Sequence, residues 1–72
     1  MTYDKLVKAI GKRVKQLRVE AGYTSYEDFA KRHDLHRMTM HRIEAGKSVS
    51  LRTLNIILQK LGVSYKEFFD EL

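Results

Sequence analysis

The sequence predicts an all-α fold, a compact domain of five helices. The chain contains no proline, it has no alternating run of β-branched residues long enough for a strand, and helix caps and stops recur along its length. A chain of 72 residues buries only about 60% of its unfolded surface. We therefore expect one domain over residues 1–72, with no room for a deep substrate cavity or a domain that senses a small-molecule ligand.

The first predicted helix covers about residues 3–21. Thr2 can cap it, and Gly22 supplies a left-handed stop. Its apolar residues recur at helical spacing: Leu6, Ile10, Val14 and Leu17. One face of this helix is therefore expected to lie in the core.

A second, short helix is predicted by the S-x-x-D capping box of Ser25 and Asp28, in which the serine accepts from an early amide and the acid reaches back. It ends near His33. A third helix is predicted over residues 37–45, because Gly46 follows it as a stop signal and its apolar residues share one face: Met40 and Ile43.

The last two helices show the same signals. Ser50 caps a fourth helix that ends at Gly62. Its apolar residues are Leu51, Leu54, Ile57, Leu58 and Leu61. Ser64 and Glu67 form a capping box for the fifth helix, which runs to the C-terminus.

Charge is unevenly distributed along the chain, whose net charge is +5. Residues 1–20 carry six basic and two acidic groups, and residues 37–52 carry four and one. Residues 21–36 and 53–72 each carry two basic and three acidic groups. The basic character is therefore concentrated in two places, which favours a basic face that meets nucleic acid.

Several classes of site are excluded. The absence of cysteine removes disulfides and thiolate zinc sites and fits a reducing, cytoplasmic location. The longest apolar run, residues 56–58, is far too short for a membrane span or a signal peptide. His33, His36 and His41 lack the spacing of metal ligands on one helix, so we expect neither a metal nor a cofactor.

The second and third predicted helices are separated by three residues, of which only Leu35 is apolar. Two short helices joined this way make a helix-turn-helix over about residues 25–46. The ordered pieces resemble the Cro and phage-repressor type of helix-turn-helix, the XRE-like transcription regulators, over nearly the whole chain. The matching residues are Ile10 to Val14, Leu17, Arg18, Ser25 to Ala30, Met40, Ile43, Glu44, Gly46, Lys47, Leu54, Ile57, Leu58 and Leu61 to Val63. The resemblance implies a lambda-repressor-like fold that binds double-stranded DNA.

Four residues of the third helix are predicted to contact bases. Arg37, in the first turn and outside the apolar face, can fork onto guanine O6 and N7. Met38 offers only an apolar contact, for which the thymine methyl is the target. Arg42, one turn after Met38, reaches a base or a neighbouring phosphate. His41 follows Arg37 by four residues along the same groove wall, with a plain surface role as the alternative.

Other donors bracket the third helix and are predicted to contact phosphates: Tyr26, Thr39, Lys47, Ser48 and Arg52. Such contacts set the register on DNA and carry no sequence information. In the family that the chain resembles, glutamine is frequent where Tyr26 stands and Ser or Thr where His36 stands. A basic stripe on the first helix is interpreted as a solvated face, with a phosphate track as the alternative: Lys8, Lys12 and Lys15.

The resemblance also implies a structural ion pair between Arg18 and Glu44, which would join the first helix to the end of the third and fix the angle of the recognition helix.

A single helix-turn-helix covers one half-site, and proteins of the family bind both half-sites as a two-fold dimer. The fifth helix offers an apolar stripe for a homodimer, with a monomer in which Phe69 caps the core as the alternative: Tyr65, Phe69 and Leu72. Phe68 is expected to point inward, as the hydrophobic-staple partner of Val63.

The sequence thus predicts a sequence-specific regulator of transcription, a repressor or an activator. One alternative is a protein-interaction module such as a small antitoxin. The two interpretations differ in the role of Arg37, which contacts a base only in the DNA-binding interpretation. Another alternative is a restriction-modification controller protein. RNA binding is a minor alternative, because the third helix lacks an aromatic platform. An enzyme is not expected, since the adjacent carboxylates Glu27 and Asp28 suit the first turn of a helix better than a catalytic pocket.

Overall fold

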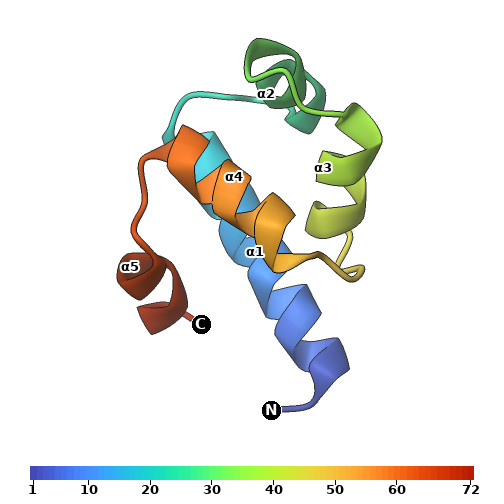
Figure 1. Ribbon diagram of the computed structural model, residues 1–72, viewed down its shortest axis with the longest axis vertical. Helices are drawn as coiled ribbons and strands as arrows, with labels where there is room; N and C mark the ends of the chain where they lie inside the picture. Colours follow the sequence, from blue (N-terminus) through green and yellow to red (C-terminus); the bar gives the residue numbers. More distant parts are fainter.

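The computed structural model covers residues 1–72 and contains five helices and no strands (Figure 1). The helices are α1 (Tyr3–Glu20), α2 (Tyr26–Arg32), α3 (Arg37–Glu44), α4 (Leu51–Leu61) and α5 (Tyr65–Asp70). The predicted all-α, five-helix fold is confirmed, and the predicted helix ends agree to within one or two residues. None of the five helices has both the length and the apolar character needed to cross a bilayer.

The predicted caps lie at the helix starts. The side chains of Thr2, Ser25, Ser50 and Ser64 each accept from a backbone amide one turn ahead. The Ser64 capping box is complete, because the Ser64 amide also donates to Glu67 Oε1 at 3.4 Å. These bonds satisfy amides that have no partner inside the helix.

The capping box predicted at Ser25 is only half present. Ser25 Oγ accepts from the Asp28 amide at 3.0 Å. The Asp28 carboxylate does not reach back, because it accepts from Arg32 Nε at 3.2 Å instead. A basic side chain four residues ahead on the helix therefore takes the acid that was expected to complete the cap.

All five helices contribute to one apolar core. Its buried residues are Ile10, Val14, Phe29, Ala30, Met40, Ile43, Leu54, Ile57, Leu58 and Phe68. Leu51 was expected on the apolar face of α4 but is 80% exposed, because it occupies the first position of that helix, beyond the end of the core.

The position of α3 depends on a close approach to α1. A Cβ atom at Gly11 would overlap the carbonyl oxygen of Ile43, so only glycine allows this contact.

In the turn between α2 and α3, Asp34 has a φ of 56°, and the Leu35 amide donates to the Ala30 carbonyl at 2.8 Å. Leu35, the apolar residue of this turn, packs against the core. In Figure 1, α2 and α3 lie on one side of α1 and α4, and α5 lies on the other.

Candidate nucleic-acid interface

A buried ion pair links α1 to the end of α3. Arg18 Nε donates to Glu44 Oε2 at 2.8 Å, and Arg18 Nη2 donates to Glu44 Oε1 at 3.0 Å. Arg18 Nη1 donates to the Tyr23 carbonyl at 2.6 Å. The two charged side chains are only 4% and 8% exposed. Both charged groups are therefore well hydrogen-bonded and largely excluded from water, and the two bonds between them fix their relative orientation.

The side chains of α3 divide between the core and solvent. Met40 and Ile43 are buried, whereas Met38, two residues before Met40, is 47% exposed. Because each residue turns the helix by about 100°, Met38 and Ala45 lie nearly opposite the buried side chains. These two residues form the exposed ridge of α3. The other predicted base-contacting residues are exposed on the flanks of this ridge: Arg37, His41 and Arg42.

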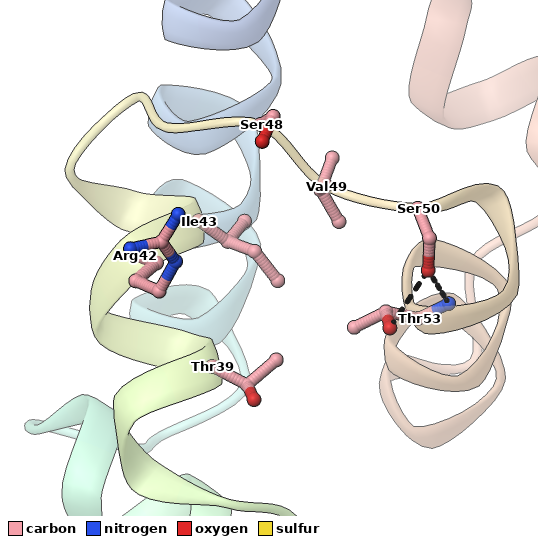
Figure 2. Close-up of a pocket in the computed structure, with 7 residues that line it drawn as sticks. All are labelled: Thr39, Arg42, Ile43, Ser48, Val49, Ser50 and Thr53. Carbon is pink, nitrogen blue, oxygen red and sulfur yellow. Dashed lines mark hydrogen bonds between the residues drawn. The ribbon is translucent and has the colours of Figure 1, made fainter.

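A hollow lies on each side of this exposed ridge. The first, which we call the α3–α4 hollow, has a volume of about 110 Å³. It is lined by Thr39, Arg42, Ile43, Ser48, Val49, Ser50 and Thr53 (Figure 2). Ser50 Oγ accepts from the Thr53 amide at 3.1 Å, so this serine is the cap of α4 as well as a lining residue. Hydroxyl groups and one guanidinium therefore surround an apolar floor.

The second, the α1–α3 hollow, has a volume of about 240 Å³. It is lined by Lys15, Arg18, Tyr26, His41, Glu44 and Ala45. The rings of Tyr26 and His41 lie 5.4 Å apart with an interplanar angle of 44°. His41 is thus turned toward Tyr26 of α2. The contact joins Tyr26, which was predicted to contact a phosphate, to His41, which was predicted to contact a base.

Cationic side chains around α3 have no acidic partners. Arg37, Arg42, Lys47 and Arg52 are all exposed, and the ion pairs of the protein involve other basic residues. The domain therefore keeps a positive field on the face that α3 presents. The predicted phosphate-contacting residues divide between two places, with Tyr26 in the α1–α3 hollow and Thr39 and Ser48 in the α3–α4 hollow. Lys47 lies in the α3–α4 turn, and Arg52 in the first turn of α4.

The three histidines have different surroundings. His33 Nε2 lies 2.9 Å from the Tyr23 hydroxyl, and its ring packs on Phe29 with centroids 4.5 Å apart. His36 caps α3, because its Nδ1 accepts from the Met38 amide at 3.3 Å. Sequence reasoning missed this cap, since histidine is not among the preferred capping residues. His41 has the ring contact with Tyr26 and no hydrogen bond of its own.

The apolar stripe predicted on α5 is partly exposed. Tyr65 is 56% exposed and Phe69 42% exposed, whereas Leu72 packs against the core. The Tyr65 hydroxyl donates to Asn55 Oδ1 on α4, so this side chain has a polar anchor within the chain. Phe68 is fully buried, in agreement with its expected inward direction.

An all-helical domain in which two short helices and a tight turn present a basic, exposed helix face is a helix-turn-helix module. A family model described as a helix-turn-helix domain matches residues 9–68, and the chain belongs to that family. This membership agrees with the resemblance to XRE-like regulators and supports DNA binding. Domains of this family are typically not enzymes. No curated protein and no solved structure matches the chain significantly.

Proposed function

We propose that this protein is a sequence-specific, double-stranded-DNA-binding regulator of transcription that acts in the cytoplasm and reads the major groove with α3. The observation that carries this proposal is the exposed ridge of α3, which lies between two polar hollows and among four cations without acidic partners. Arg37 and Arg42 supply donors for base edges, and Met38 supplies an apolar contact.

The dimensions of B-DNA agree with this arrangement. An α-helix with its side chains is about 10–12 Å across, and the major groove is about 12 Å wide. A helix in the groove therefore has a sugar-phosphate backbone on each flank. The two hollows lie on the flanks of α3, where their hydroxyl groups and basic side chains can meet phosphates.

We further propose that the protein binds as a homodimer through α5. Two copies related by a two-fold axis would place two α3 helices about 34 Å apart, one turn of DNA. Phe69 is the centre of the proposed interface, with Tyr65 beside it and Leu72 at the edge, where it also packs on its own core.

The test is selection of bound duplexes from a random pool, followed by footprinting and by titration at several salt concentrations. We expect enrichment of one sequence with two half-sites, protection of the major groove, and affinity that falls steeply with salt, because bound phosphates release counterions. Failure to enrich any sequence, or a flat salt response, would contradict the proposal. The alternative of a protein-interaction module would then gain support.

A further inference from the structure

We propose that Lys15, Tyr26 and His41 form a binding site for one DNA phosphate in the α1–α3 hollow, and that His41 binds this phosphate in its protonated form. The inference rests on the proposed function and deepens it in two respects. It assigns His41 to the backbone instead of a base edge, and it makes the affinity for DNA depend on pH.

The tyrosine and histidine side chains of the protein differ in whether they have hydrogen-bond partners, and of these residues only Tyr26 and His41 line the α1–α3 hollow. The hydroxyls of Tyr23 and Tyr65 and the rings of His33 and His36 each have a hydrogen-bond partner within the protein. The Tyr26 hydroxyl and the His41 ring have none, and Lys15 has no ion pair. Three groups that can donate to an anion therefore line one hollow and lack partners in the protein alone. They come from three helices, α1, α2 and α3.

The charge balance of the hollow favours an anion. The charged or titratable groups that face His41 are Lys15 and Arg18 from α1, Tyr26 from α2 and Glu44 from α3. The Glu44 carboxylate is already neutralised by two hydrogen bonds from Arg18. Arg37, one helical turn before His41, adds a further positive charge. The net charge around His41 is therefore positive, and the hollow has no unpaired acidic group to balance it.

A phosphate bound beside the His41 ring provides an opposite charge that stabilises the imidazolium. Binding of DNA is then linked to uptake of a proton. Imidazole is the side chain that changes charge between pH 5 and 8, so the link operates close to neutral pH.

The first test compares the affinity for a selected duplex between pH 5.5 and 7.5 at constant ionic strength, by fluorescence anisotropy. We expect wild-type binding to be about three- to tenfold tighter at pH 5.5. His41→Phe keeps a ring beside Tyr26 but cannot be protonated, and its affinity should not follow pH. His36→Ser is the matched control, because serine preserves the cap of α3. Its pH response should equal that of the wild type.

The second test places a single uncharged methylphosphonate at successive backbone positions of the same duplex. One position should weaken binding of the wild type and have almost no further effect on His41→Phe. Lys15→Gln should show the same loss of coupling, whereas Lys12→Gln, one turn earlier on α1 and outside the hollow, should not.

The outcomes separate the two proposals. Binding by the wild type without any pH response, an unchanged response in His41→Phe, or no coupled position would overturn this inference alone. Failure of the wild type to bind any selected duplex would overturn the proposed function and this inference together.

Discussion

Arg18 and Glu44 lie 26 residues apart in the sequence and are joined by two parallel hydrogen bonds, at 2.8 and 3.0 Å. This pair connects the last turn of α1 to the last residue of α3. The contact between Gly11 and Ile43, two turns earlier on α1, acts on the same helix. Together they fix the direction of α3, so its exposed side chains project from a rigid base.

Replacing Arg18 with Met should destabilise the protein strongly. The variant leaves the Glu44 carboxylate buried and unpaired, and breaking a buried pair in this way costs about 3–5 kcal/mol. Chemical denaturation measures the loss, and affinity for DNA should fall only as far as less protein is folded. Arg18→Met combined with Glu44→Leu should recover much of the stability, since no charge is left buried. Unchanged stability with lost DNA binding would instead make Arg18 a contact residue.

Arg37→Ala and Lys47→Ala should weaken DNA binding in different ways. Loss of a guanidinium that bonds a base edge costs about 1–3 kcal/mol and relaxes the preference at one base pair. Loss of a phosphate contact weakens all sequences about equally and reduces the salt slope by about one. Binding of both variants to a panel of single-base-pair variants of the selected duplex distinguishes these patterns. Equal losses on every duplex for Arg37→Ala would assign that residue to the backbone.

Met38 should be sensitive to a single methyl group on the DNA. Its side chain lies at the outermost part of α3, where the thymine methyl is the apolar partner available in the major groove. Replacing thymines of the selected duplex one at a time with deoxyuridine removes that methyl alone. We expect one position to weaken wild-type binding and to have little effect on Met38→Ala. If no deoxyuridine position shows this coupling, Met38 makes no such contact.

Phe69→Asp should give a folded monomer. The side chain is 42% exposed, and its ring packs edge-on against Phe68 with centroids 5.1 Å apart, so the replacement should cost some stability without unfolding the protein, whereas a charge in the proposed interface opposes association. Circular dichroism should show native helix content, sedimentation should give the monomer mass, and affinity for a duplex with two half-sites should fall. Tyr3→Asp is the control, because Tyr3 is also an exposed aromatic residue and lies on α1. A wild type that sediments as a monomer and binds a single half-site equally well contradicts the dimer.

The fold could be predicted from the sequence because its signals are local. Caps such as Ser50 and Ser64, and glycines that follow helices, act within one turn of the chain. The errors were local as well. The Asp28 carboxylate had two possible partners, the backbone ahead of its helix and Arg32, and spacing alone could not decide between them.

The candidate site was predicted less completely, because it depends on how helices cross. The direction of Met38 follows from helical periodicity and agrees with the structure. The contact between Tyr26 and His41 depends on the angle between α2 and α3, which periodicity does not give. Lys15 similarly looked like part of a solvated stripe, and only the packing of α1 against α3 places it at the edge of a hollow.

The separation of tasks along α3 has a consequence for how such proteins diversify. Met40, Ile43 and Glu44 hold the helix to the rest of the molecule, while Arg37 and Met38 face solvent and contribute little to folding. Exchanges at the exposed positions therefore leave thermal stability nearly unchanged. Under the proposed function, a duplicated gene could acquire a new DNA target through a few such exchanges, and each intermediate along the way would still encode a folded protein.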